Sequence, residues 1–319
     1  MKINTLLTVL ATVAITAPLS SHAQTINWTG LGTDPTDWNE AANWDGDPSG
    51  NPRIQFNTGD VATGDTDFST TNLFDIFNGA EVTWAENSLT IGTTTLANGG
   101  GTLNVTGGSV EATVSTKIGQ ASNVTSNFNV TGGSYSQTTD GTMTFGAAPN
   151  SISNIVVSGT GSLDTDRTWV IGNSNNSTIN MDVIGEDFSI TQTKNQDFRT
   201  GGKSNSFFNL NLELGQTGFG LFSIGDWDKK AGITNNLTVD ATSFLGAVGP
   251  GVLLIDGGSN GLDTYFDSTT IVGGAYVTEI RSSPDGQDLY LVAVPEPGAF
   301  VLMGLSTAAL VMLRRRSQK

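Results

Sequence analysis

Three copies of one pattern decide the fold of this chain: "LNVTGGSV" (residues 103–110), "FNVTGGSY" (128–135) and "IVVSGTGSL" (155–163). Apolar and polar residues alternate in each copy, so that Leu103 and Val105 point to one side of the chain and Asn104 and Thr106 to the other. A glycine-containing turn then ends the run. This period of two, rich in β-branched residues, predicts short β-strands.

The pattern returns at a nearly constant distance along the chain, which predicts a repeat architecture. Looser copies occur at 179–185, 208–215 and 237–244. Pairs of an apolar residue and a glycine recur with glycine spacings of 27, 27, 26 and 53 residues, at Ile91-Gly92, Ile118-Gly119, Phe145-Gly146, Ile171-Gly172 and Ile224-Gly225. A unit of about 26 residues has room for three strands and three turns, so the sequence predicts an all-β fold, a right-handed parallel β-helix.

Stacked coils of such a helix bring equivalent residues of successive repeats into contact. We therefore expect Ile118, Phe128 and Val130 to lie in the core above their counterparts one coil earlier, which are Ile91, Leu103 and Val105. A propeller fits less well because its blades need about 40 residues or more, and a sandwich gives no reason for glycines to recur in register.

The predicted segments follow from this repeat. Residues 24–85 form an N-terminal cap and the first strands, 86–245 the β-helix, and 246–292 a closing antiparallel β segment. Open ends of a stack of strands must be covered, and the cap offers bulky side chains for this purpose, Trp28, Trp38, Trp44, Phe56 and Phe68.

The first 23 residues have the layout of a secretory signal peptide. Lys2 precedes an apolar run, and small residues end the segment, which places the cleavage site between Ala23 and Gln24. His22 is the one histidine of the chain, and the chain has no cysteine. The exported part therefore offers no imidazole, thiol or disulfide, which excludes Ser-His-Asp and Cys-His catalysis and His- or Cys-bound zinc.

The exported part is strongly acidic. Residues 24–296 hold 30 acidic and nine basic residues, a net charge of −21. A negative field of this size disfavours binding to nucleic acid and to anionic membrane surfaces, whereas it favours binding of divalent cations and suits an extracellular medium of high ionic strength.

The C-terminal segment, residues 293–319, combines three features in a fixed order. Pro295-Glu296-Pro297 precedes an apolar run of about 15 residues, and the arginine cluster Arg314, Arg315 and Arg316 follows it. The run predicts a transmembrane helix, short for a bilayer, with the arginines on the cytoplasmic side. This arrangement resembles the PEP-CTERM sorting signal.

The resemblance implies the route that the protein takes. It implies recognition of the Pro-Glu-Pro motif by an exosortase-type enzyme after signal peptidase has acted, with transient anchoring in the inner membrane of a Gram-negative-type cell. Release to the cell surface or extracellular matrix, in association with exopolysaccharide, would follow. A permanent membrane anchor is the alternative. The repeats are similar to those of autotransporter-type passenger β-helices, which bears on architecture and not on activity.

Some right-handed β-helices are polysaccharide lyases or hydrolases, so carboxylates and basic residues of the repeats are candidate catalytic groups. Hydrolases need clustered carboxylates, and local pairs occur at Asp164/Asp166, Glu186/Asp187 and Asp226/Asp228, none with an evident partner one coil away. Lyases need a basic residue, for which the repeats offer Arg167, Lys194, Arg199, Lys203, Lys229 and Lys230. We interpret these residues as solvated loop charges and predict no catalytic site.

Two binding functions, for calcium and for sugars, remain as alternatives. Calcium prefers oxygen ligands near glycine turns, which two stretches offer, with Asp34, Asp37, Glu40, Asp45 and Asp47 in the first and Asp256 and Asp263 in the second. Exposed tryptophans would suit sugar binding, but the six in this chain form no regular stripe, so burial is the expectation. The sequence thus predicts a non-catalytic structural or adhesive surface protein, with a carbohydrate-active enzyme or a calcium- or glycan-binding module as alternatives.

Overall fold

The protein is described from a computed structural model. The description covers residues 24–77, 79–96, 100–138, 141–193, 197–201, 203–245, 252–257, 265–273 and 278–293. The predicted signal peptide and the segment from 294 to the C-terminus lie outside these ranges.

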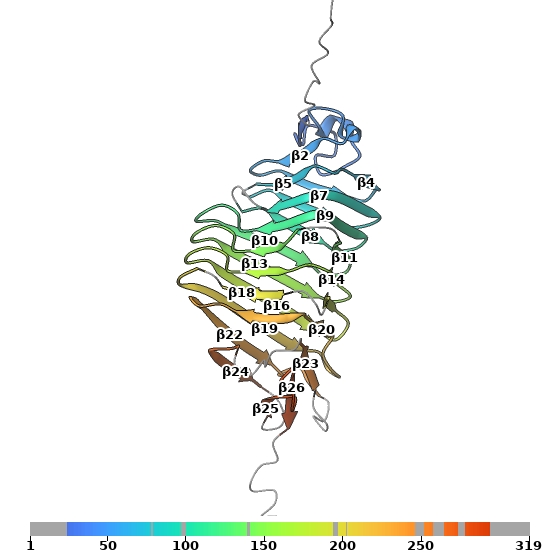
Figure 1. Cartoon of the computed structure of the whole chain (residues 1–319). Coiled ribbons are helices and arrows are strands. Elements are labelled where there is room, and N and C mark those ends of the chain that lie inside the picture. The colour runs from blue at the N-terminus through green and yellow to red at the C-terminus, as the bar shows by residue number, and fades with distance from the viewer. Residues whose placement is uncertain are drawn as a thin grey trace, which may run out of the picture.

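One sheet contains nine parallel strands, each from a different repeat (Figure 1). Every neighbouring pair in it is parallel. In spatial order the strands are β3 (Val61–Gly64), β6 (Glu81–Trp84), β8 (Thr102–Val105), β10 (Thr125–Val130), β13 (Ile152–Ser158), β16 (Thr178–Gly185), β19 (Ser206–Leu214), β22 (Ile233–Asp240) and β24 (Ser268–Val272).

The second sheet, of 17 strands, consists of two ladders joined by its longest members, β7 (Ser88–Leu96) and β9 (Ser109–Ile118). The front ladder adds β4 (Phe68–Ser69), β11 (Ser134–Gln137), β14 (Ser162–Thr165), β17 (Ser189–Gln192), β20 (Leu221–Ser223) and β23 (Val252–Asp256). The back ladder adds β1 (Thr25–Asn27), β2 (Arg53–Phe56), β5 (Leu73–Ile76), β12 (Met143–Phe145), β15 (Trp169–Ile171), β18 (Asp197–Thr200) and β21 (Asp226–Lys229).

Each repeat thus runs through the nine-stranded sheet, then the front ladder, then the back ladder, and returns one position further along the stack. The strands β10, β11 and β12 form one such rung. This all-β architecture of parallel strands is the arrangement that a β-helix requires, and no α-helix occurs between residues 90 and 240 in the described ranges.

The repeat length changes along the stack. Stacked asparagines from Asn127 to Asn236 are separated by 25 to 29 residues from their partners one rung earlier. The first rungs are shorter, since Val61 pairs with Glu81 and Glu81 with Thr102. The predicted stacking of Phe128 on Leu103 and of Val130 on Val105 is confirmed.

The predicted stacking of Ile118 on Ile91 is wrong. Ile118 is in register with Leu96, and Ile91 with Ala112 of the other ladder. The spacing misleads here because this rung is short: in-register partners lie 21 residues apart at Ile91 and 22 apart at Leu96, whereas 27 residues separate Ile91 from Ile118. Ile224-Gly225 is likewise out of phase, because it follows β20 in the front ladder.

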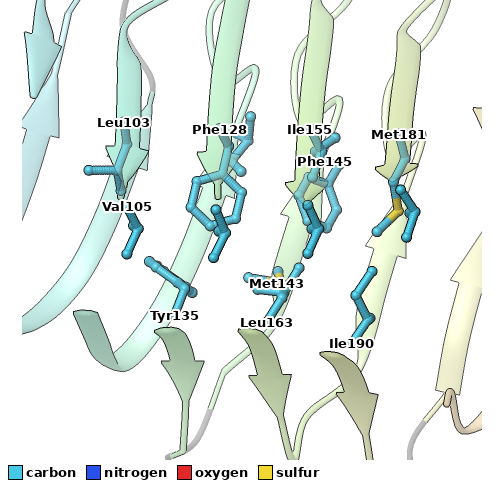
Figure 2. Packing of buried hydrophobic residues seen from close by; sticks show 14 of the residues in the cluster. Leu103, Val105, Phe128, Tyr135, Met143, Phe145, Ile155, Leu163, Met181 and Ile190 are labelled. Carbon is cyan, nitrogen blue, oxygen red and sulfur yellow. The ribbon is translucent and has the colours of Figure 1, made fainter. Parts of the chain in front are cut away.

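The side chains that point inward form one continuous hydrophobic core from Ile26 to Leu291. Figure 2 shows a part of it, in which labelled side chains from Leu103 to Ile190 follow one another along the stack. Ile118, Phe128 and Val130 are fully buried in it, as predicted. The three in-phase glycines end strands of the back ladder, and each has a positive φ: Gly119 (68°), Gly146 (64°) and Gly172 (70°). At Gly146 a Cβ would lie 2.8 Å from Cδ1 of Ile179, so the turn needs glycine for both its conformation and its space.

The N-terminal end of the stack is covered by aromatic side chains. Trp28, Trp38 and Trp44 are buried and pack on one another, in a segment with two short 3-10 turns, η1 (Ala41–Asn43) and η2 (Pro48–Gly50). Trp38 also contacts Phe56 and Phe68. Burial of three indole rings explains how an exposed sheet end is closed.

At the other end the antiparallel prediction holds for part of the segment. β26 (Asp288–Ala293) pairs antiparallel with β23 and with β25 (Thr278–Ser282). In contrast, β24 extends the nine-stranded sheet in parallel. Among the described residues no helix is long and apolar enough to cross a membrane; the predicted transmembrane segment lies outside them.

Candidate functional site

The outer face of the nine-stranded sheet carries a ladder of asparagine side chains. In each step an Nδ2 group donates to the Oδ1 atom one rung earlier, at 2.8–3.0 Å, along Asn127, Asn154, Asn180, Asn209 and Asn236. Thr102 and Ser268 extend the ladder at its two ends. Because each amide both donates and accepts, this column of side chains is a regular, uncharged strip, whereas other outward positions of the sheet carry Glu81, Asp182, Glu213 and Asp240.

The predicted carboxylate pairs have local structural roles. Asp164 is exposed on β14 beside Ser136 and Thr191, and it accepts a hydrogen bond from the latter. Asp166 forms an ion pair with Arg167 at 3.1 Å. Asp164 has no carboxylate as its in-register neighbour, and Asp166 lies beyond the end of β14.

Glu186 and Asp187 lie in an exposed turn after β16. The hydroxyl and backbone N–H of Thr217 donate to Glu186 at 2.6 and 2.9 Å. These hydrogen bonds lower the pKa of Glu186, which is the opposite of what a general acid near neutral pH requires.

The third pair differs from the prediction, because it does have a partner one rung away. Asp226 on β21 is in register with Asp197 on β18, and Asp228 is in register with Arg199. The variable repeat length hid this alignment in the sequence. Arg199 donates to Asp197 at 2.8 Å and lies 3.6 Å from Asp228, so a cation offsets the repulsion between the stacked carboxylates.

A groove lies on the outer face of the back ladder next to these residues. Residues on or next to β12, β15 and β18, together with residues of the turn after β21, line it. It has a volume of about 580 Å³ and is lined by Thr142, Thr144, Val170, Asn173, Arg199, Gly201, Lys230 and Ala231. Sequence reasoning missed this groove, although six of the nine basic residues of the exported part fall between 167 and 230.

The carboxylates proposed for calcium hold their own loop together. Backbone N–H groups of Thr33 and Asp34 donate to Glu40 and lower its pKa. Asp45 accepts from Asn27, and Asp47 accepts from the backbone of Ser49. Within the described ranges, which exclude Asp263, no group of three or more acidic or histidine residues could hold a metal ion.

All six tryptophans are buried, as expected, so none offers a sugar-stacking surface. They are Trp28, Trp38, Trp44, Trp84, Trp169 and Trp227.

Of the predicted processing residues, the structure describes Gln24 alone, which is exposed and accepts a backbone hydrogen bond from Arg53. Ala23, Pro295, Glu296, Pro297 and Arg314–Arg316 lie outside the described residues.

The fold defines an all-β protein of stacked parallel strands with a polar outer surface. Its C-terminal residues 293–316 match the PEP-CTERM protein-sorting motif, and the chain is therefore a protein with a PEP-CTERM sorting signal. This motif implies processing by an exosortase-type system, with export and sorting to the cell envelope or surface. No curated protein and no solved structure matches the chain.

Proposed function

We propose that this protein is a right-handed β-helical rod that an exosortase-type system delivers to the cell surface, where it acts as a non-catalytic structural or adhesive component of the extracellular polysaccharide matrix. The observation that carries this proposal is that the sorting motif begins at residue 293, where β26, the last strand of the stacked fold, ends. A stack of this kind is a spacer that presents one regular surface along its length.

Three features of the body support a structural role outside the cell. The core runs without a break through every rung. Its cohesion needs no disulfide, since the chain has no cysteine. The polar strip of asparagines and threonines suits contact with hydrated neutral polymers, because amide and hydroxyl groups both donate and accept hydrogen bonds.

The proposal is tested in the native host. Cells are separated into inner membrane, outer envelope and extracellular matrix, and the protein is followed by antibody in the wild type and in a strain lacking residues 293–319. We expect the wild-type protein in the matrix fraction and the truncated protein elsewhere, with weakened cell attachment in a deletion strain. Equal attachment with and without the gene would contradict the adhesive role.

A carbohydrate-active enzyme is the second candidate, and the stacked aspartates favour it. Asp197 and Asp226 share a column on the back ladder with Asp228 two residues further on, and glycoside hydrolysis uses two carboxylates flanking the scissile bond. The full-length chain is incubated with neutral and uronate-containing polysaccharides, with and without calcium. New reducing ends or unsaturated uronate, lost in Asp226→Asn but kept in Asp164→Asn, would establish the enzyme in place of the structural role.

A further inference from the structure

The groove on the back ladder combines positive charge, hydroxyl groups and a small apolar surface. Thr144, Val170 and Arg199 stand in register on β12, β15 and β18, with Lys117 one rung before them. Thr142 precedes Thr144, and their hydroxyl oxygens are 3.1 Å apart. Gly201 also lines the groove, and a Cβ at this position would lie 2.7 Å from Cγ2 of Ile233.

The charged side chains that line this groove are cations, each paired with an aspartate beside it, whereas the protein as a whole is acidic. Among the described residues that line it, Arg199 and Lys230 carry charge and none is a carboxylate, although acidic residues outnumber basic ones by 30 to nine in the exported part. Two other surface pockets contain acidic residues, in keeping with the acidic composition of the whole protein. One contains Glu186 and the other Asp60, and no cation occurs among the described residues that line either.

The two cations are held in place and keep donors for a ligand. Nη2 of Arg199 donates to Asp197, and Nζ of Lys230 lies 2.5 Å from Asp228. Nε of Arg199 is buried and lies 3.6 Å from Oδ2 of Asp228, so the donors open to a ligand are those of the two Nη groups. A guanidinium has five N–H donors and an ammonium three, so several remain for an anion, and the paired aspartates fix the side chains that carry them.

We propose that this groove binds a carboxylate-bearing sugar unit of an acidic polysaccharide. The volume falls within the usual range of about 300–1,000 Å³ for small-molecule sites. The guanidinium and ammonium groups face the carboxylate, the threonine hydroxyls and the Asn173 amide bond the ring hydroxyls, and Val170 and Ala231 contact the C–H face of the ring. This proposal rests on the matrix function above and names the polymer class that the rod would hold.

The test measures binding of trigalacturonate to the full-length chain in detergent by isothermal titration calorimetry. Its methyl ester, which has the same rings without charge, is the matched ligand control. The ionic strength is set near 0.15 M, where the screening length is about 8 Å and the distant acidic residues contribute little. We expect one binding site and an affinity at least about tenfold higher for the acid than for the ester, as one charged hydrogen bond provides.

Variants locate the site. Arg199→Gln and Lys230→Gln should each weaken trigalacturonate binding about tenfold, whereas Arg281→Gln, an equal charge change on β25, should leave it unchanged. Lys230 lies in a half-exposed turn, so its variant folds even if the Arg199 variant does not. Equal binding of acid and ester, or an equal loss in all three variants, would overturn the proposal.

Calorimetry and the cell fractionation described above together separate this proposal from the function on which it rests. A protein that reaches the matrix but does not bind trigalacturonate overturns the groove assignment alone. A protein that binds trigalacturonate through Arg199 but never leaves the cell supports the groove and overturns the matrix role.

Discussion

Tyr135 is a polar residue buried in the core, and its hydroxyl makes two hydrogen bonds. It lies 2.7 Å from the Thr116 hydroxyl and donates to the Thr94 hydroxyl at 3.0 Å, so three residues from three rungs share one hydrogen-bond network. Burial raises the pKa of Tyr135 to about 12. The hydroxyl therefore stays protonated in the folded protein at pH values where the unfolded chain already loses its proton.

This pKa predicts a loss of stability at alkaline pH. Below pH 10 neither state of the protein ionises Tyr135, and its contribution is complete. Between pH 10 and 12 the unfolded state alone releases the proton, so the free energy of unfolding falls, by roughly 2–3 kcal/mol. Urea unfolding between pH 9 and 12 should show a shallower decline for Tyr135→Phe than for wild type. If the free energy of unfolding falls equally with pH in Tyr135→Phe and in wild type, the raised pKa of Tyr135 is contradicted.

Gln137, two residues along the same strand, is buried, and neither polar atom of its side chain has a hydrogen-bond partner among the described residues. A buried unpaired amide costs about 1–3 kcal/mol. Gln137→Met keeps the length of the side chain and removes both polar atoms, so it should raise the free energy of unfolding by about 1–2 kcal/mol. Gln192 serves as the control, because its amide donates to two backbone oxygens and Gln192→Met should destabilise. A loss of stability in both variants would refute this reading of Gln137.

At the scale of the strand, the asparagine ladder links successive rungs outside the core. Asn180 donates to Asn154 and accepts from Asn209, both at 2.9 Å. Asn180→Ala removes both bonds and should lower the free energy of unfolding by about 1–3 kcal/mol. Thr178→Ala, a change on the same outer face of β16, should have a smaller effect. The ladder contributes nothing if chemical denaturation finds equal losses for the two variants.

The sequence predicted the strands of these rungs because alternation is a local signal. Leu103, Phe128 and Ile155 were aligned by their motif, and they are in register. Ile91 was misaligned because the early rungs are shorter and a register shift separates the two halves of β7. Position in a ladder depends on loop length, which alternation does not encode, so the stacking of Asp226 on Asp197 was also missed.

At the scale of the whole molecule, the same limit explains why the groove was not predicted. Its lining comes from four rungs and from turns of unequal length, and only the concentration of basic residues between 167 and 230 pointed to it. The sorting motif is different in kind, because it is read as a contiguous segment. A contiguous motif of this kind can be recognised in the sequence without any knowledge of the fold.

The sorting motif gives the last prediction. Glu296→Ala, or loss of Arg314 to Arg316, should leave most of the protein unprocessed in the inner membrane. Glu296 is the charged residue of the matched Pro-Glu-Pro motif, and the arginines hold the following apolar segment in its orientation by remaining on the cytoplasmic side. Cell fractionation locates the protein, and intact mass reports whether the tail is present. Glu279→Ala, on β25, changes the same residue type outside the motif and should be processed as wild type.

The two variants separate recognition from orientation. Glu296→Ala keeps the arginine cluster, so its protein should stay anchored with the motif outside and uncut. Loss of the arginines removes the charges that prevent the tail from crossing the membrane, so part of this protein should be exported with the uncut tail attached. Normal removal of the tail in both variants would show that neither element is read, and the delivery of the rod to the surface would then need another signal.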